Sequence, residues 1–151
     1  RAFDKTAFEK DAARFLEMLL AQDRLLGTRS EFRLGRWTSQ ARSLAPDAEG
    51  ADWLEWNARV QISTWGNREC ADAGGLRDYA HKEWNGMLKD FYYPRWAAFF
   101  GTLSDNLDGK PLRSIDFYAM EEPWTLKTGD CSPAAEGDPV DIALETARRF
   151  L

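Results

Sequence analysis

The spacing of the apolar residues constrains the fold of this chain more than any other feature. Through most of its 151 residues, apolar side chains recur at intervals of three and four, which gathers them along one side of successive α-helices. No stretch of any length alternates apolar with polar residues, which is the pattern of a half-buried strand. The sequence therefore predicts an all-α fold, a single helical bundle domain of about six or seven helices covering residues 1–151.

Residue types that favour helix ends mark several of these helices. The first apolar stripe extends to Leu26, and Gly27 is suited to cap it, because glycine is enriched just after helices. Ser30 is a good N-cap for a second helix, and Asp116 and Asp138 are the expected N-caps of the last two. The predicted inward-facing residues of the first two helices are Phe8, Ala12, Phe15, Leu16 and Leu19, then Leu34, Trp37, Ala41 and Leu44.

The middle of the chain predicts three more helices and a loop. Residues 51–65 carry two apolar stripes, so this helix is expected to lie between neighbours at the centre of the bundle. A glycine-rich loop over 66–75 leads to a fourth helix over 76–91. Pro94 begins a fifth, because proline suits a first helical turn. The apolar face of the predicted fourth helix consists of Leu76, Ala80, Trp84, Met87, Leu88 and Phe91.

The composition argues against several classes of function. Hydrophobic residues make up 44% of the chain and charged residues 30%, as in globular domains. A formal net charge of -5 argues against binding to nucleic acid, which requires clustered lysine and arginine. No apolar run approaches the roughly 20 residues of a membrane-spanning helix, so no membrane partner is expected. The chain starts at Arg1 with no signal-peptide pattern, and we expect it to be part of a longer polypeptide.

Few residues are suited to nucleophilic catalysis or metal binding. His81 is the single histidine and no serine lies in a nucleophile-elbow motif, so His81 is expected to be a solvated side chain. Cys70 and Cys131, together with one histidine, do not make a convincing zinc site. A disulfide between them is possible, but two unpaired thiols are favoured. No metal and no cofactor are therefore expected.

Paired carboxylates require a separate argument, because glycoside hydrolysis uses two of them across one bond. Glu121 and Glu122 are adjacent, so on a helix they point about 100° apart and cannot both face one substrate. Glu69 and Asp72 lie in the glycine-bracketed loop, where they could face a cleft or be solvated loop charges. Nothing requires an acid–base pair, which suits an accessory domain better than a self-sufficient enzyme.

One region combines aromatic, polar and glycine residues in the way that carbohydrate sites do. Loop rims of this kind are frequent places for binding sites. In the alternative interpretation, Trp65 and Trp96 are core anchors, Tyr79 bonds a helix end, and Arg95 ties helices together. The region consists of Trp65-Gly66-Asn67-Arg68, Leu76-Arg77-Asp78-Tyr79-Ala80 and Asp90-Phe91-Tyr92-Tyr93-Pro94-Arg95-Trp96.

These residues carry a resemblance to a known family. The runs SEFRLGRWTSQARSLA, NARVQISTWGN, LRDYAHKEWNGMLKDFYYPRW and GDPVDIALETARRFL follow one another in the order and at the spacing of that family. From about Phe15 to Leu151, the chain resembles the C-terminal helical domain of the α-N-acetylglucosaminidases, glycoside hydrolase family 89. The specific combination is Trp65-Gly66, Asp78-Tyr79-Ala80 and Tyr93-Pro94-Arg95-Trp96.

The resemblance implies that this chain works beside a catalytic neighbour. Family members have a small N-terminal domain, a central (β/α)-barrel that holds both catalytic glutamates, and this helical domain packed on the barrel. They remove terminal α-linked N-acetylglucosamine with retention, through a covalent glycosyl-enzyme. The implied partners are the barrel of the same polypeptide and a glycan ending in α-linked N-acetylglucosamine. The parent is expected to be exported to a periplasmic, extracellular or lysosomal location.

The resemblance also implies which residues face the substrate. It implies no catalytic residue in this chain, and it makes the helical domain one wall of the active-site pocket. Trp65, Leu76 and Tyr79 are the expected substrate-binding residues, which would stack on the terminal sugar and donate one hydroxyl contact. Such a wall excludes water and so strengthens the electrostatic effect of the barrel glutamates. Residues 68–70 are inserted relative to the family pattern and lengthen the loop after Trp65.

Two other functions remain to be weighed against this one. The chain could be a non-catalytic helical carbohydrate-binding or protein-interaction module, recognisable by an exposed aromatic platform far from any barrel-facing surface. A free-standing helical enzyme is disfavoured because the sequence assembles no acid–base pair. We expect the chain alone to be inactive, with a large exposed apolar patch near the ends of the third and fourth helices.

Overall fold

The computed structural model describes residues 4–73, 77, 78 and 80–151. Within these residues the chain forms seven α-helices, a short 3-10 helix and a π-helical turn, which confirms the all-α prediction. No helix in the described ranges combines the length and the apolar character needed to cross a lipid bilayer. The elements are α1 Lys5–Leu26, η1 Ser30–Phe32, α2 Leu34–Arg42, α3 Ala48–Gln61, α4 Arg68–Ala73, η2 Leu88–Tyr92, α5 Tyr93–Leu107, α6 Phe117–Thr125 and α7 Pro139–Phe150.

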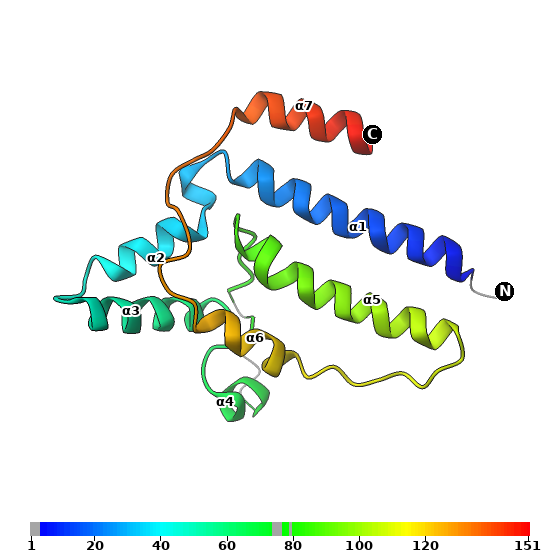
Figure 1. Cartoon of the computed structure of the whole chain (residues 1–151), viewed down its shortest axis with the longest axis horizontal. Helices are drawn as coiled ribbons and strands as arrows, with labels where there is room; N and C mark the ends of the chain where they lie inside the picture. The colour runs from blue at the N-terminus through cyan, green and yellow to red at the C-terminus, as the bar shows by residue number, and fades with distance from the viewer. Residues whose placement is uncertain (1–3, 74–76, 79) are drawn as a thin grey trace.

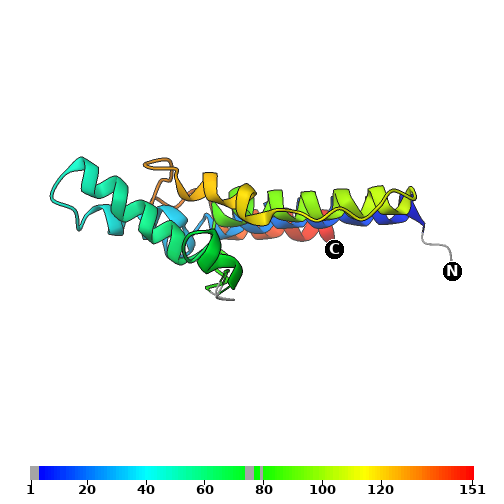
Figure 2. The same cartoon turned by 90° about the horizontal axis from the view of Figure 1, so that it is seen from below.

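Three long helices form a flat layer. Helices α7, α1 and α5 lie side by side with α1 in the middle (Figure 1). Seen edge-on, they make a thin layer, and α4 projects from one of its faces (Figure 2). Helices α2 and α3 form a hairpin beyond the end of the layer, and α6 packs beside α3 and η2. Because a domain usually needs two packed layers to bury its apolar faces, this arrangement leaves the faces of α1 open.

The hydrophobic core lies at the junction between the layer and the hairpin. The π-helical turn η2 is its centre, because η2 packs against α1, α5 and α6. Met87 has no exposed surface and Leu34, at the start of α2, is 1% exposed. The buried residues of this core are Leu34, Ile62, Met87, Leu88, Phe91, Tyr92 and Trp124.

An aromatic seam joins α1 to α5. The ring of Phe15 lies edge-on to Trp96 and Phe100, with centroid distances of 5.1 and 5.5 Å. Phe8 extends the seam with an edge contact to Phe100 at 6.1 Å. Edge contacts of this kind add to the free energy gained from apolar burial. Since Phe15 and Trp96 both remain more than a third exposed, the seam is covered on one side only.

The fourth helix predicted over 76–91 is helical only from Met87 onward, and the prediction is wrong for the described residues before it. Leu76 and Tyr79 lie outside the described residues, and the described residues between 77 and 86 form turns and an extended segment. The reason is non-local pairing: the Asn85 amide donates to Phe32 O at 2.8 Å, and Asn85 O accepts from the Leu34 amide at 3.0 Å. These bonds replace the i to i−4 bonds of a helix. Gly86, with φ of 92°, then turns the chain into η2.

A buried carboxylate of α1 fixes this turn. Asp23, 4% exposed, accepts hydrogen bonds from the Gly86 amide at 2.7 Å and the Lys89 amide at 3.1 Å. The Asn85 side-chain amide donates to the same carboxylate at 2.7 Å. Burial raises the pKa of Asp23, although the bonds from Gly86, Lys89 and Asn85 act in the opposite direction. Asp23 therefore caps the first turn of η2 from another helix.

The third helix exists, but its predicted central place is wrong. Helix α3 packs on α2 and α6 at the end of the molecule, and Trp53 is 59% exposed on it. Its buried residues combine Ala51, Ala58 and Val60 with a charged pair, because Glu55 and Arg59 have no exposed surface and lie 2.9 Å apart. Glu55 also binds Arg42 of α2 at 2.9 Å. The apolar pattern included Ala58 and Val60, which are buried, but it could not reveal Glu55 and Arg59, because a buried ion pair is polar in sequence.

The connection from α6 to α7 is bound to the α2–α3 hairpin. Arg59 also binds Asp130, and Glu55 accepts from the Gly129 amide at 2.8 Å. A Cβ added to Gly35 in α2 would lie 2.2 Å from Ser132 O, closer than any side-chain carbon can approach. Position 35 therefore requires glycine for this contact.

Most of the other predicted helix ends are confirmed. Gly27 follows α1, and the side chains of Asp116 and Asp138 accept amide hydrogen bonds at the starts of α6 and α7. Ser30 begins the separate 3-10 turn η1, so its predicted role as the cap of the second helix is wrong. The loop predicted over 66–75 contains the short helix α4, which the glycine content of the segment concealed.

Candidate functional site

The candidate site begins where α3 ends. Ile62, Ser63 and Thr64 are buried, and Trp65 follows them with an indole that is 40% exposed. The Trp65 backbone has φ of 62°, and its amide donates to Val60 O at 2.8 Å. A positive φ is unusual for a residue with a large side chain and persists only when the surroundings hold it. The buried segment thus turns sharply and delivers one tryptophan to the surface.

Helices α4 and α6 form the rim beside this turn. Gly66 O accepts from the Tyr118 hydroxyl at 3.5 Å, and the Arg68 guanidinium lies 4.8 Å from the centroid of the Tyr118 ring. Arg68 also binds Asp116, the N-cap of α6, at 2.9 Å. The Arg68 guanidinium and the Ala119 amide hold the pKa of the Asp116 carboxyl below its usual value. The start of α4 is therefore attached to the start of α6.

A second strained residue lies next to this turn. Asp78 has φ of 58°, and its amide donates to Ser63 O at 2.7 Å, two residues before Trp65. Both oxygens of its carboxylate are also bound. Arg95 Nη1 lies 2.8 Å from Oδ2, and the Tyr92 hydroxyl donates to Oδ1. Asp78 therefore connects the backbone of the Trp65 turn to the start of α5.

Glu121 of α6 completes the charged group, which we call the Asp78 network: Arg77, Asp78, Tyr92, Arg95 and Glu121. Glu121 is 3% exposed and accepts from Arg95 Nε at 2.8 Å and from Arg77 Nε at 3.1 Å. Burial and the bond to Asp78 raise the pKa of the Tyr92 hydroxyl, so it stays protonated and donates. Burial would lower the pKa of Arg95, but Glu121 and Asp78 outweigh it and raise the pKa.

The Asp78 network cannot supply the acid and base of a hydrolase. Both oxygens of Glu121 accept bonds from arginines, and the group is too buried for a substrate to reach. Glu122 accepts from the Tyr118 hydroxyl at 3.3 Å, so the two adjacent glutamates face different partners, as their spacing predicted. Glu69 and Asp72 are both exposed on α4. In the described ranges, no three His, Cys, Asp or Glu side chains gather as a metal site would require.

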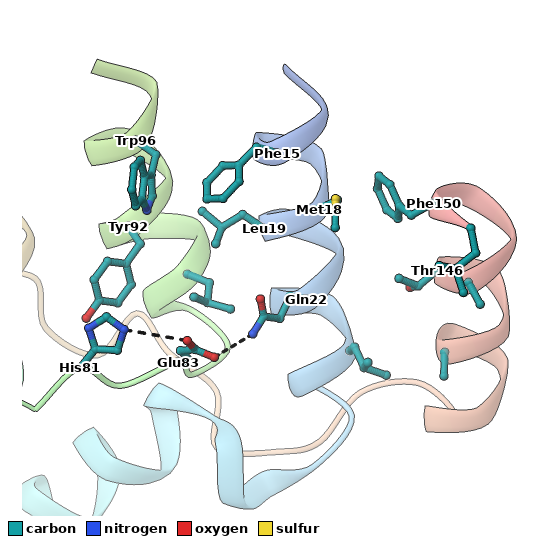
Figure 3. A pocket seen from close by; sticks show the side chains of 15 residues that line it. Phe15, Met18, Leu19, Gln22, His81, Glu83, Tyr92, Trp96, Thr146 and Phe150 are labelled. Atoms are coloured by element: carbon teal, nitrogen blue, oxygen red, sulfur yellow. Dashed lines mark hydrogen bonds and ion pairs between the residues drawn. The ribbon is translucent and has the colours of Figure 1, made fainter. Parts of the chain in front are cut away.

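An apolar groove of about 640 Å³ extends from this network along the flat layer. Figure 3 shows Phe15 and Trp96 near one end of it, Phe150 on the opposite side, and His81 with Glu83 at the other end. Tyr92 lines the groove with its ring, while its hydroxyl binds Asp78. Tyr92 therefore connects the groove to Asp78 and, through it, to the Trp65 turn.

The polar end of the groove is built from exposed side chains. The side chain of His81 is 70% exposed, which confirms the predicted solvated histidine. Its Nε2 lies 3.9 Å from Glu83, and Glu83 accepts from the Gln22 amide at 3.0 Å.

Cys70 and Cys131 are both free thiols, as favoured from the sequence.

The predicted site residues lie in different parts of the structure. Trp65 lies at the surface, at the end of α3, and is no core anchor. Leu76 and Tyr79 lie outside the described residues, so their roles stay predictions. Arg95 joins α5 to α6 and to Asp78, as the packing interpretation expected. Trp96 belongs to the aromatic seam rather than to the rim of Trp65.

The sequence interpretation missed Glu121 as a member of the site. Glu121 is 3% exposed, whereas Met120, the residue before it, is 39% exposed. A signal was present, because Glu121 lies four residues after Phe117 and three before Trp124, on the same helical face. A glutamate on an apolar face indicates a buried cationic partner.

This chain is similar in sequence and in structure to proteins of a known family. The family model described as the alpha-N-acetylglucosaminidase (NAGLU) C-terminal domain matches residues 1–149. Human alpha-N-acetylglucosaminidase is 34% identical over an alignment of 132 residues, and the match covers 84% of this chain and 17% of the human protein. The chain therefore spans about a sixth of the length of that relative.

Solved structures agree with the sequence match. A family 89 glycoside hydrolase from Clostridium perfringens, in complex with PUGNAc, superposes with a TM-score of 0.82 at 35% identity. The match covers 92% of this chain and 17% of that enzyme. A second structure, from the same organism and in complex with its substrate GlcNAc-alpha-1,4-galactose, matches with a TM-score of 0.79 at 35% identity. It covers 93% of this chain and 18% of the other. This chain belongs to the family of α-N-acetylglucosaminidase C-terminal domains.

Proposed function

We propose that this chain is the helical domain of an exo-acting α-N-acetylglucosaminidase, in which it forms one wall of the active-site pocket. The catalytic glutamates lie in a barrel domain of the same polypeptide, and the substrate is a glycan with a terminal α-linked N-acetylglucosamine. One observation carries the proposal: a buried backbone segment turns at positive φ and presents the indole of Trp65 to the surface. An aromatic face held rigidly at a rim is suited to stack on a sugar ring.

The shape of the chain supports a large partner domain. Its accessible surface is 9529 Å², whereas a compact monomer of 17.3 kDa exposes roughly 7,800 Å². The excess is about twice the 800 Å² that one partner contributes to a standard interface. The groove along the open layer supplies apolar surface for such a contact. A neighbouring domain in the same polypeptide is the simplest partner, because the match covers only 17% of the length of the relatives.

The substrate class follows from the relatives. The Clostridium perfringens enzyme binds GlcNAc-alpha-1,4-galactose in a form with two glutamates replaced by glutamine. This supports a mechanism in which two carboxylates act across the glycosidic bond. In our proposal both come from the neighbouring domain, and the helical wall keeps water away from the sugar, so charges in the pocket act more strongly.

The test is a pair of substitutions in the full-length enzyme that carries this domain. Trp65→Ala removes the stacking face, and we expect kcat/KM on an α-N-acetylglucosaminide to fall by about tenfold or more. Tyr79→Phe removes one hydroxyl, and we expect a smaller loss. Unaltered kinetics in both variants would contradict the proposal. Circular dichroism of both variants controls for folding.

A second function is favoured by one specific observation. Trp53 and Trp56 form an exposed pair on α3, with ring centroids 6.3 Å apart. Such a pair suits a non-catalytic carbohydrate-binding or protein-interaction module. Trp53→Ala separates the two functions: the pocket-wall function predicts unchanged kcat/KM, and the module predicts loss of glycan binding by the chain without any change in hydrolysis.

A further inference from the structure

The Trp65 turn is strained, and something must hold it. Three residues other than glycine have positive φ in the described ranges: Trp65, Asp78 and His81, at 62°, 58° and 43°. All three fall within one short segment, and the first two are joined by the 2.7 Å bond from the Asp78 amide to Ser63 O. Strained backbone of this kind persists only where its surroundings determine it, and it is concentrated at functional sites.

The Asp78 network holds the Trp65 turn in its strained conformation. Two donors from the start of α5, the Tyr92 hydroxyl and Arg95 Nη1, occupy the two oxygens of Asp78. Arg95 is fixed in turn, because its Nε and Nη2 lie 2.8 and 2.6 Å from the same oxygen of buried Glu121. The Arg95 guanidinium also lies 4.9 Å from the Phe91 ring centroid. The network therefore attaches the Trp65 turn to two helices at once.

A gain in stability alone does not explain why the Asp78 network consists of buried charges. Buried ion pairs lose most of their attraction to desolvation, and apolar residues of the same volume often hold a core equally well. The Asp78 network carries such a desolvation cost, since Arg77 Nη2 is buried without a hydrogen-bond partner. Hydrogen-bonded ion pairs fix the relative orientation of the groups they join, because each bond has a preferred geometry. Apolar contacts do not.

We propose that Asp78, Arg95 and Glu121 are positioning residues, which set the orientation of Trp65 toward the sugar through the bond from the Asp78 amide to Ser63. This inference rests on the proposed function and deepens it. None of the three residues touches the substrate. They act on the backbone of the turn, so their loss leaves Trp65 in the chain but misplaces its indole. A small misplacement is enough to lower the rate of a reaction that depends on alignment.

The experiment uses conservative variants of the full-length enzyme. Asp78→Asn keeps the shape of the side chain and removes its charge, and Arg95→Lys keeps the charge and loses the fork that reaches two carboxylates. We expect each to lower kcat/KM by about tenfold. Tyr92→Phe removes one hydroxyl only and is expected to lower it severalfold. Arg113→Gln is the matched control, because it breaks a 2.5 Å surface ion pair with Asp105, which lies on α5 like Arg95. Its kcat/KM is expected to equal that of the parent enzyme.

A double-substitution cycle separates positioning from general damage. If the Asp78 network acts through Trp65, adding Asp78→Asn or Tyr92→Phe to Trp65→Ala costs little more than Trp65→Ala alone. If the losses multiply, the network acts elsewhere and the inference is overturned. Because Tyr92→Phe changes so little, it decides the matter where Asp78→Asn or Arg95→Lys fails to fold.

The outcomes also distinguish the two proposals. Full activity of Trp65→Ala overturns this inference, and full activity of Tyr79→Phe as well overturns the proposed function. Reduced activity of Trp65→Ala, together with parent-like kinetics in Asp78→Asn and Tyr92→Phe, overturns the inference alone. Reduced activity in all three, without further loss in the double variants, supports both.

Discussion

At the scale of single residues, buried charges fix the positions of loops. Arg59 has no exposed surface and binds both Glu55 and Asp130, which holds the connection before α7 against α3. Cys131 lies in the same group, with its sulfur 3.6 Å from Arg59 and 3.2 Å from Asp130. Burial and the bond to Asp130 raise the pKa of the Cys131 thiol to about 11, despite the nearby Arg59.

The two thiols should therefore react at very different rates. Cys70 is exposed, whereas only about a thousandth of Cys131 is thiolate at pH 8, because its raised pKa lies far above that pH. With a disulfide reagent at pH 8, we expect one fast thiol per chain and a second that reacts only as the pH approaches 11 or the chain unfolds. Cys70→Ser should abolish the fast phase. Equal rates for both thiols in the folded chain would contradict the burial of Cys131.

How far the sequence predicted the candidate site depends on the range of the interactions. The Trp65 turn was found from local residues and from the family resemblance. Glu121 was missed because its partners, Arg77 and Arg95, are distant in sequence, and only the fold brings them together. The strain at Asp78 was equally hidden, since nothing in its neighbours requires a positive φ.

At the scale of elements, close backbone contacts decide which helices can pack. Helix α2 approaches the connection before α7 so closely that a Cβ at Gly35 would meet Ser132 O at 2.2 Å. Gly101 of α5 is the opposite case, because a Cβ there has no neighbour within 4 Å. These two helical glycines therefore have different functions, and the sequence alone does not distinguish them.

Substitution of both glycines tests this contrast. Gly35→Ala should destabilise the chain by about 2 kcal/mol or more, because backbone must move to relieve the overlap. Gly101→Ala should stabilise it by about 0.5–1 kcal/mol, because alanine is the better helix former. Thermal unfolding of the two variants against the parent chain measures both signs. Equal shifts in Tm for the two variants would show that α2 is not packed as described.

The helices that the sequence predicted well are those whose signals are local. Asp116, Asp138 and Pro94 lie within the first turns they mark, so caps and proline were sufficient. The fourth helix failed because Asn85 bonds to residues 32 and 34, about fifty positions earlier. No periodicity within 76–91 could reveal a competing partner so far away.

At the scale of the whole molecule, the flat layer leaves more surface open than a domain of this size needs. The apolar groove lies along α1, α5 and α7, so the patch predicted near the third and fourth helix ends is only in part where it was expected. Its rim of Phe15, Trp96 and Phe150 comes from three elements that the sequence could identify but not place (Figure 3).

The chain by itself should not hydrolyse a glycoside. Glu121 is buried between two arginines and Glu122 faces Tyr118, so these two glutamates form no acid–base pair. We expect the purified 151-residue chain to release no chromophore from an α-N-acetylglucosaminide, with the full-length enzyme as the positive control. Turnover that increases in proportion to the concentration of the chain would refute this.

The central place of α1 has a consequence for biosynthesis. Its neighbours arrive late, since Phe15 packs on Trp96 and the Arg14 guanidinium donates to Phe150 O, 136 residues further along. The contacts between α2 and α3 are local in sequence, so this hairpin can form before residues 129–132 bind to it. Helix α1 must instead wait, with its apolar face uncovered, until α5 and α7 have been synthesised. Within this domain, α1 is therefore the helix that most needs protection by chaperones during synthesis.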